Sequence, residues 1–223
     1  EIIEPLAPYS PAKVRGEAER DDYEDARIAH FGTGTKLPES SKPRPLTQLL
    51  NWGLQDLLSK YPEMLVFGED VGKRGGVYGV TAQLYEKSSA GRVFNTLLDE
   101  QSILGMAIGA GQLGFLPVPE IQYLAYYHNA EDQIRGEAST LQFFSKGQLR
   151  NPMVIRIASW GYQRGFGGHF HNDNSIAALR DVPGVVIASP SRGEDAVGML
   201  RTALALAHVD GRIVFFLEPI ALY

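Results

Sequence analysis

The pattern of hydrophobic and polar residues changes near residue 45. From residue 46, "LTQLLNWGLQDLLSKY" places apolar residues at helical spacing, and Pro62 ends that pattern. Further along, short apolar runs alternate with longer segments of helical periodicity. These patterns predict strands at 64–70, 91–96, 117–122, 151–158, 184–189 and 212–219, and helices at 46–61, 100–115, 125–145 and 192–208.

The alternation of strands and helices predicts the fold class. Several of the strands are apolar on both faces, which is typical of a parallel sheet covered by helices. We therefore predict an α/β fold with a mainly parallel sheet and helices on both faces. Ligands of such folds bind beyond the carboxyl ends of the strands. Asp70, Glu100, Gln122 and the loop 160–174 each end or follow a predicted strand, so we expect them along one rim.

The first 45 residues differ from the rest of the chain. They hold six of the thirteen prolines, are densely charged and show neither helical nor strand periodicity. We interpret 1–45 as a charged, proline-rich strap or linker ahead of an α/β domain at 46–223. Two alternatives stay open, a mobile tail and a strap docked on a partner domain. Because the sequence starts at Glu1 rather than methionine, we expect a fragment or a processed product.

Composition narrows the classes of function. Hydrophobic residues make up 44% of the chain and the mean hydropathy is -0.14, values typical of a soluble globular protein. No apolar run has the length of a membrane span, and no signal-peptide pattern opens the chain. A net charge of -5 gives no electrostatic support to binding of nucleic acid or an anionic membrane. The lack of cysteine excludes disulfides, zinc–thiolate sites and a thiol nucleophile, and it fits a reducing compartment.

A glycine motif at 109–114, "GAGQLG", has the spelling of a dinucleotide-binding fingerprint. That fingerprint belongs in the turn between a strand and a helix, whereas these glycines begin well inside the predicted helix. We therefore predict no nicotinamide dinucleotide site. Instead, we expect Gly105, Ala107 and Gly109 to let this helix approach a neighbour closely.

Two groups of polar residues are candidates for chemistry. Asp99 and Glu100 stand at a helix start, where a carboxylate either caps the helix, offsets its dipole or points into a cleft at the rim. His169 and His171 would face one side of a strand and could chelate a metal, with Asp173 as a further ligand. Without a recognisable metal motif, we favour an acid, base or hydrogen-bonding role for a histidine of this loop and predict no metal ligands.

Five stretches in one order closely resemble a known enzyme family. They are "FGEDVGKRGGVYGVT", "RVFNTLLDEQSILGMAIG", "PVPEIQYLAYYHNAEDQI", "GGHFHNDNSIAALRDVPGVVIASPS" and "FFLEPIALY". Together they resemble the pyrimidine-binding domain in the beta subunit, or beta-like half, of the thiamine-diphosphate-dependent component of 2-oxo acid dehydrogenase complexes. The resemblance covers about residues 47–223. The terminal stretch and the loop at 68–81 favour this family over transketolase and deoxyxylulose-phosphate synthase, which share the fold.

The resemblance implies roles for five residues. Glu100 matches the family glutamate that hydrogen-bonds a ring nitrogen of the cofactor's aminopyrimidine and so acts in catalysis. Gln122 and Tyr126 match residues that line the pyrimidine pocket, and Leu98 would place its backbone beside the pyrimidine. His171 lies twelve residues before Pro183, as the family's substrate-assisting histidine does, although Asn172 and Asp173 replace the usual Ser-Gln.

The resemblance also implies an activity and partners. We expect thiamine-diphosphate-dependent decarboxylation of a 2-oxo acid and transfer of the acyl group to lipoamide, in the bacterial cytoplasm or the mitochondrial matrix. The family holds Mg²⁺ through a Gly-Asp-Gly motif on a diphosphate-binding, alpha-like domain or subunit, and 1–223 contains no such motif. We therefore expect a homodimer or alpha–beta assembly, a lipoyl-bearing acyltransferase as partner, and no activity of this chain alone. The alternatives are a transketolase-like ketol transferase and a non-catalytic scaffold.

Overall fold

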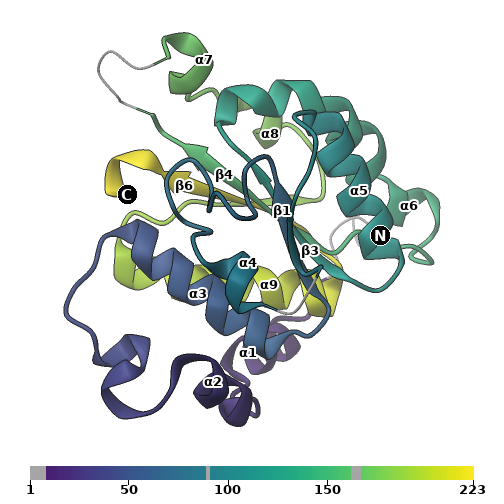
Figure 1. Ribbon diagram of the computed structural model, residues 1–223. Helices are drawn as coiled ribbons and strands as arrows, with labels where there is room; N and C mark the ends of the chain where they lie inside the picture. The colour runs from purple at the N-terminus through teal and green to yellow at the C-terminus, as the bar shows by residue number, and fades with distance from the viewer. Residues whose placement is uncertain (1–8, 89–90, 162–166) are drawn as a thin grey trace.

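The computed structural model describes residues 9–88, 91–161 and 167–223. Six strands form one parallel sheet in the order β2-β1-β3-β4-β6-β5 (Figure 1). Each strand lies on an apolar run of the sequence, and the predicted fold class is confirmed. The strands are β1 (Met64–Gly68), β2 (Val93–Asn95), β3 (Leu116–Ile121), β4 (Met153–Ser159), β5 (Val185–Ala188) and β6 (Ile213–Pro219).

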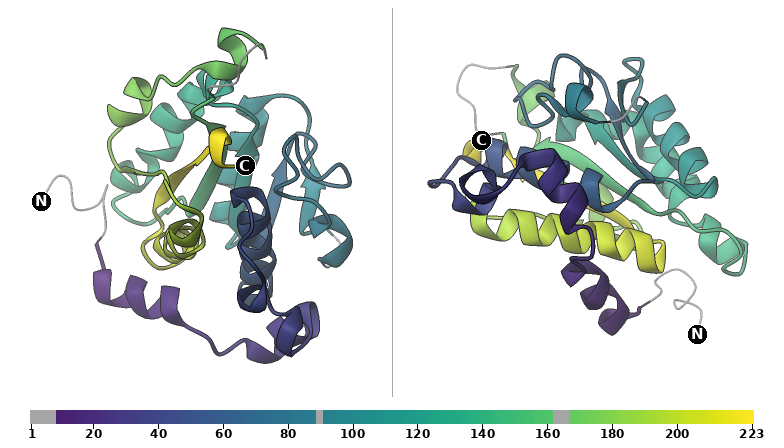
Figure 2. Two further views of the ribbon diagram at one scale, coloured as in Figure 1. Left: turned by 90° about the vertical axis from the view of Figure 1, so that its left-hand side faces the viewer. Right: turned by 60° about the horizontal axis from the view of Figure 1, so that its bottom comes forward.

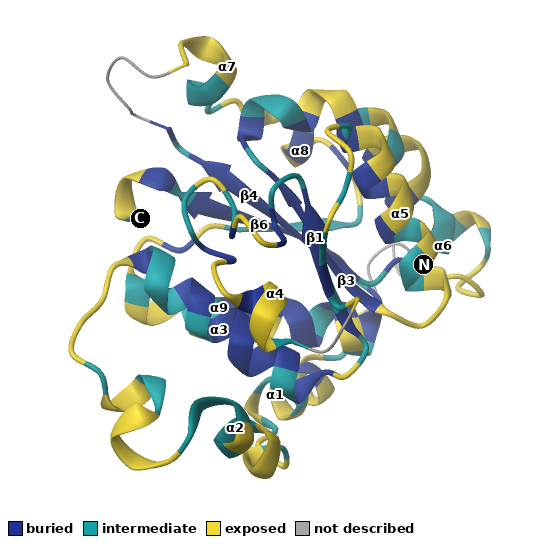
Figure 3. Cartoon of the chain, viewed as in Figure 1, coloured by how far each residue is buried: buried dark blue, intermediate teal, exposed yellow. Residues whose placement is uncertain are grey.

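Helices cover both faces of the sheet because alternate strand residues point to opposite sides. Helices α3 (Leu46–Lys60) and α9 (Gly193–Asp210) pack on one face, against side chains such as Val214 and Phe216 (Figure 2). On the other face, Phe215 and Leu217 contact α5 and the segments that follow it. Figure 3 shows the buried sheet between these layers. The second face carries α5 (Glu100–Gln112), η3 (Leu124–Ala130), η4 (Gln133–Ala138) and α8 (Ala177–Arg180).

Strand β3 contains two prolines although it lies inside the sheet. Proline has no N–H to donate to a neighbouring strand. The amide of Leu116 bonds to the β1 side, so Pro117 and Pro119 face β4 by strand alternation. Pairing with β4 is correspondingly limited to Glu120 and Ile121. The prolines therefore leave β3 paired along β1 and joined to β4 only at its carboxyl end.

The predicted helix at 125–145 is wrong as a regular α-helix. The segment winds through η3, of 3₁₀ geometry, and η4, of π geometry, and ends in α6 (Leu141–Phe144). Near its end, the hydroxyls of Ser139 and Thr140 bond carbonyls four residues earlier, a contact that bends helices. The sequence analysis also missed α4 (Leu84–Lys87), α7 (His169–Asn172), α8 and the closing turn η5 (Ile220–Leu222).

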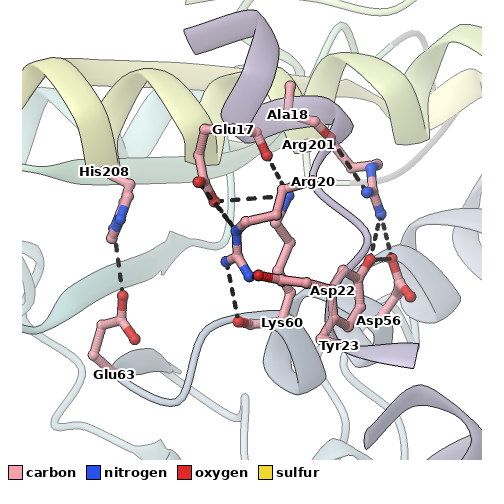
Figure 4. A network of polar contacts seen from close by, with 10 residues as sticks. All are labelled: Glu17, Ala18, Arg20, Asp22, Tyr23, Asp56, Lys60, Glu63, Arg201 and His208. Carbon is pink, nitrogen blue, oxygen red and sulfur yellow. Dashed lines mark hydrogen bonds and ion pairs between the residues drawn. The ribbon is translucent and has the colours of Figure 1, made fainter. Parts of the chain in front are cut away.

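Residues 9–45, here called the strap, are folded against the chain's own domain. They form α1 (Pro11–Glu19), α2 (Glu24–Phe31), η1 (Gly34–Lys36) and η2 (Pro38–Ser40), helices that the sequence analysis did not predict. Helix α1 packs on α9 and α2 packs on α3. Val14 is the buried apolar residue of α1, and Figure 4 shows polar contacts that join the strap to α3 and α9.

Asp56 of α3 is the centre of these polar contacts. It accepts hydrogen bonds from Tyr23, from Arg27 at 2.7 Å and from Arg201 of α9. Lys60, whose side chain is buried, donates to the carbonyl of Glu17. Burial, together with the charge of Arg201, lowers the pKa of Lys60 to about 8. The strap is thus held by charged groups that lie far apart in sequence.

In the described ranges, no helix is both long enough and apolar enough to cross a membrane.

Candidate active site

The carboxyl edge of the sheet carries the candidate site. From β1 the chain goes outward to β2, and from β2 it crosses back through α5 to β3 on the other side. Connections that leave in opposite directions open a crevice beyond the strand ends. Glu69 follows β1, Glu100 begins α5 after β2, and Gln122 follows β3. The topology therefore brings these three residues to one rim.

Glu100 is a buried carboxyl group at the first position of α5, with 5% of its surface exposed. Asn129 Nδ2 donates to its Oε2 at 3.1 Å. In the described part of the chain, no partner is assigned to Oε1. Asp99 is the cap of the same helix, since its carboxylate accepts from the amide and hydroxyl of Ser102. With the capping role filled by Asp99, the carboxyl of Glu100 remains available at the rim.

Glu69 connects the residues that the sequence analysis proposed. Its carbonyl accepts a long hydrogen bond, 3.5 Å, from Gln122 Nε2. Burial raises the pKa of the Glu69 carboxyl, and the charges of Asp70 and Glu100 raise it further. Burial also raises the pKa of Tyr126, to which the charges of Glu69 and Glu100 add. The charge of Glu100 thus acts on the pKa of both Glu69 and Tyr126 at this rim.

Aromatic rings form the next part of the rim. The Tyr126 hydroxyl lies 3.2 Å from His171 Nε2, and His171 Nδ1 lies 3.1 Å from the carbonyl of Gly167. The edge of the His171 ring meets Tyr123, with ring centroids 4.5 Å apart. Tyr123 also packs against Tyr126 at 5.5 Å and is itself buried. His171 therefore packs against two tyrosines, and its Nε2 can accept a hydrogen bond from the hydroxyl of Tyr126.

The neighbouring histidine has different surroundings. His169 is exposed and stacks on Phe170, with ring centroids 4.0 Å apart. Both histidines lie in helix α7, where side chains two residues apart point in different directions. On a strand, the same two side chains would have faced one side. Asp173 accepts from His128 at 3.2 Å instead. Among the described residues, no group of three metal-binding side chains converges. Residues 162–166 of the predicted loop 160–174 lie outside the described residues.

A buried charge cluster supports the rim from below. Arg156 of β4 makes a two-pronged contact with Glu218 of β6, at 2.6 and 2.8 Å, and donates to Glu120 of β3 at 2.7 Å. Tyr223 donates its hydroxyl to Glu218. Burial raises the pKa of Glu120. The cluster joins three strands near their carboxyl ends, and its residues line one small pocket together with Gln122.

The loop between β1 and α4 contacts this cluster. Its tight turns place Gly75 and Gly76 at positive φ, 79° and 77°. A Cβ on Gly75 would lie 2.7 Å from the Cα of Ala82, so glycine is required there. The Tyr78 ring of this loop packs on Tyr223 at 5.0 Å and on Tyr123 at 6.0 Å. The loop thus joins the buried charge cluster to the aromatic rim.

One expectation about helix α5 differs from the structure. The side chain of Leu98, just before this helix, is 71% exposed, and the role expected for its backbone stays a prediction. Gly105 and Gly109 lie on the outer side of α5, where an added Cβ would meet no described atom within 4 Å. The predicted close packing at these two glycines is therefore wrong for this chain, because the helical phase turns them outward. Gly111 makes a close approach instead, since its Cβ would lie 3.2 Å from Pro152.

Sequence reasoning missed four residues of the rim: Glu69, Tyr78, Tyr123 and Asn129. Glu69 directly precedes the predicted rim residue Asp70, so its position after an apolar strand was the signal that could have identified it. The other three lie in segments whose irregular path the sequence pattern does not reveal.

Comparisons with known proteins agree with this geometry. The family described as "Transketolase, pyrimidine binding domain" matches residues 43–223. The 2-oxoisovalerate dehydrogenase subunit beta of Pseudomonas aeruginosa is 35% identical over 178 residues, which are 80% of this chain and 49% of that protein. The pyruvate dehydrogenase E1 component subunit beta of Staphylococcus epidermidis is 35% identical over 183 residues, 80% of this chain and 53% of that protein. The chain thus spans about half the length of these curated relatives.

A solved structure supports the same fold. A split-gene transketolase, described as an inactive beta4 tetramer, superposes with a TM-score of 0.59 at 17% identity, covering 79% of this chain and 51% of that one. At this identity the likeness concerns the fold alone. The match over residues 43–223, by contrast, covers most of the sequence. The chain belongs to the family of transketolase pyrimidine-binding domains.

Proposed function

We propose that this chain supplies the pyrimidine half of a thiamine diphosphate site in an enzyme that decarboxylates 2-oxo acids and passes the acyl group to lipoamide. The observation that carries the proposal is Glu100, a buried carboxyl at a helix start with one oxygen still unassigned. Its surroundings at the rim match the place where this fold binds ligands. The relatives named as 2-oxoisovalerate and pyruvate dehydrogenase beta subunits support the reaction class.

The residues present fit an aminopyrimidine. A ring nitrogen needs one hydrogen-bonding partner that can share a proton, and Glu100 Oε1 can serve because Asn129 occupies Oε2. Asn129 also fixes the orientation of the carboxyl group. Tyr126 offers an aromatic surface next to it, and Gln122 offers an amide. The pocket therefore combines one proton-sharing group, one ring and one amide.

In our proposal, Glu100 and His171 each handle a proton at this rim. Thiamine diphosphate, when bound, supplies the carbon nucleophile and the electron sink for decarboxylation. Glu100 holds a proton at the pyrimidine nitrogen, where burial keeps the hydrogen bond strong. His171 Nε2 accepts from the Tyr126 hydroxyl in this structure; once protonated at Nε2, His171 would donate to the substrate carbonyl oxygen. Burial, with the charges of Asp70 and Glu100, raises the pKa of the Glu69 carboxyl at the same rim.

The rest of the site belongs, in our proposal, to a partner. A diphosphate calls for a divalent cation with oxygen ligands, and the described residues bring no such cluster together. We propose that an alpha-like diphosphate-binding domain or subunit holds Mg²⁺ and that a lipoyl-bearing acyltransferase accepts the acyl group. A transketolase-like ketol transfer is the second candidate, because the matching family is named after the transketolase domain.

Turnover by the complete assembly distinguishes these two functions. The protein, co-expressed with its diphosphate-binding partner, is assayed with pyruvate, 2-oxobutyrate and 2-oxoisovalerate and a lipoyl domain as acceptor. We expect acyl-lipoyl formation with at least one of them and no ketol transfer between sugar phosphates. Ketol transfer without 2-oxo acid turnover would overturn the proposal. In parallel, calorimetry on this chain alone should show no micromolar binding of thiamine diphosphate with Mg²⁺.

A further inference from the structure

A cavity of about 890 Å³ lies between the strap and the domain, away from the rim. The strap passes it between η2 and the start of α3. None of the rim residues lines it, and the family match begins only at residue 43. The strap therefore builds a wall that the domain alone does not have. This cavity, the strap pocket, lies between Arg27, Lys42 and Arg44 of the strap and Trp52, Asp56 and Gly193 of the domain.

Every carboxylate that lines the strap pocket already has a cationic partner. Arg27 contacts both oxygens of Glu39, at 2.9 and 2.6 Å, and Asp56 at 2.7 Å. These contacts, above all the hydrogen bonds with Glu39, raise the pKa of Arg27, so its charge is fixed. Glu194 is paired with Arg192. The negative charges of these carboxylates are therefore balanced by arginines that line the same pocket.

Three donor groups of the strap pocket have no assigned partner among the described residues: two cationic side chains and one indole N–H. Lys42 and Arg44 are exposed toward the pocket, and within the part of the chain that the structure describes neither has a carboxylate partner. Trp52 is half-buried in the wall, and its Nε1–H likewise has no acceptor among the described residues. With five cationic and three acidic side chains lining it, the pocket is positive in a chain of net charge -5. Its unassigned groups are all donors.

The start of α9 adds further donors. Gly193 and Glu194 line the pocket, and the cap residue Arg192 makes no side-chain capping bond. The first amides of this 18-residue helix are therefore without a side-chain acceptor, at the positive end of its dipole. They lie in the same cavity as Arg44 and Trp52. Guanidinium, ammonium and amide donors together suit an acceptor with several oxygens.

We propose that the strap pocket binds a phosphate-bearing anion. A phosphate offers several acceptor oxygens and up to two negative charges, which matches the surplus of donors. Trp52 and Pro43 give an apolar wall on which the organic part of a phosphate ester can lie. The occupant assigned by this chemistry is a small organic phosphate or diphosphate. The proposal stands independently of the function proposed for Glu100.

The fluorescence of Trp52 tests the proposal directly. The chain has two tryptophans, so Trp160→Phe leaves Trp52 as the sole indole. Inorganic pyrophosphate is titrated into this full-length variant at constant ionic strength. We expect a saturable change in emission, and a Kd raised about tenfold or more by Lys42→Gln/Arg44→Gln, because two charge-assisted hydrogen bonds are lost. The matched control Lys13→Gln/Lys146→Gln removes the same charge from exposed positions outside the pocket and should leave the Kd within about twofold.

Several outcomes of this titration would overturn the proposal that the strap pocket binds an anion. One is the absence of a saturable signal up to millimolar pyrophosphate in a variant whose thermal melting is unchanged. Another is equal weakening in both double variants, which would show only the general charge of the surface. ADP and adenosine form a second arm: ADP should bind at least as well as pyrophosphate, and adenosine much more weakly. Equal binding of adenosine and ADP would contradict an anion site.

Discussion

The Tyr126 hydroxyl and His171 Nε2 lie 3.2 Å apart although the residues are separated by 45 positions in sequence. Tyr126 follows β3, and His171 belongs to α7 after β4. The second ring nitrogen of His171 is fixed by the carbonyl of Gly167 at 3.1 Å. The pair therefore sets both the position and the tautomer of the histidine at the rim.

Replacing the two histidines should give unequal effects. His171→Ala removes the ring held by Tyr123 and Tyr126, and we expect turnover of the assembled enzyme to fall by about 10²-fold or more. His169→Ala removes an exposed ring and should leave turnover within about twofold. Steady-state kinetics on both variants checks this ranking. The reverse ranking would place the substrate-facing histidine at 169.

Tyr126→Phe isolates the hydrogen bond itself. The ring and its packing on Tyr123 remain, whereas the hydroxyl that orients His171 is lost. We expect a loss in kcat of about fivefold to twentyfold, the size of one hydrogen bond of about 1–2 kcal/mol, with a shifted pH profile of kcat. Cofactor affinity should stay within a factor of about three. An unchanged kcat and pH profile would show that the bond has no part in the reaction.

Removing Arg156 should strongly destabilise the fold. Arg156→Met leaves Glu120 and Glu218 buried without their cation, a change that typically costs about 3–5 kcal/mol of unfolding free energy. The loss should shrink at lower pH, because protonation removes the unpaired charges. Denaturant unfolding at pH 5 and pH 7.5 measures both effects. Arg180→Met breaks an exposed pair with Asp181 and should change stability little. Similar stabilities of the two variants would contradict a structural role for the buried cluster.

Lys60 gives the attachment of the strap a pH dependence. Its pKa is about 8 in the folded chain and about 10.4 in an unfolded one, so between these values only the unfolded chain holds the proton. The free energy of unfolding therefore rises with pH through this window, because folding no longer has to bury a charged Lys60. The gain is lost as pH falls toward 8, where Lys60 is protonated in both states. Relative to Lys60→Met, the wild type should gain about 1–2 kcal/mol between pH 7.5 and 9.5 in denaturant unfolding. Parallel pH dependences of the two proteins would refute the lowered pKa.

The sequence predicted the sheet well because burial in a parallel sheet leaves apolar runs, as in "MLVFG" and "RIVFFLEP". It did not predict α1 and α2, whose attachment depends on partners such as Asp56 with Arg27 and Glu17 with Lys60. Such polar pairs join segments far apart in sequence and leave no periodicity.

The candidate site shows the same limit. The position of Glu100 at a helix start was visible in the sequence, but its contact with Asn129 depends on the irregular η3 segment. Likewise, Glu69 fell inside the predicted strand 64–70, and the crossover from β2 brings Glu100 to the same rim. The roles of Gln122, Tyr126 and His171 remain predictions.

Glu100→Gln, in the assembled enzyme, tests the central claim that Glu100 handles a proton at the cofactor's pyrimidine. Glutamine keeps the shape and a hydrogen bond but cannot share the proton. Glu137→Gln, at an exposed position on η4, is the matched control. We predict that Glu100→Gln binds thiamine diphosphate within about tenfold of the wild type while turnover with saturating cofactor falls by about 10²–10⁴-fold. Turnover close to that of Glu137→Gln, with cofactor saturating, would contradict the account.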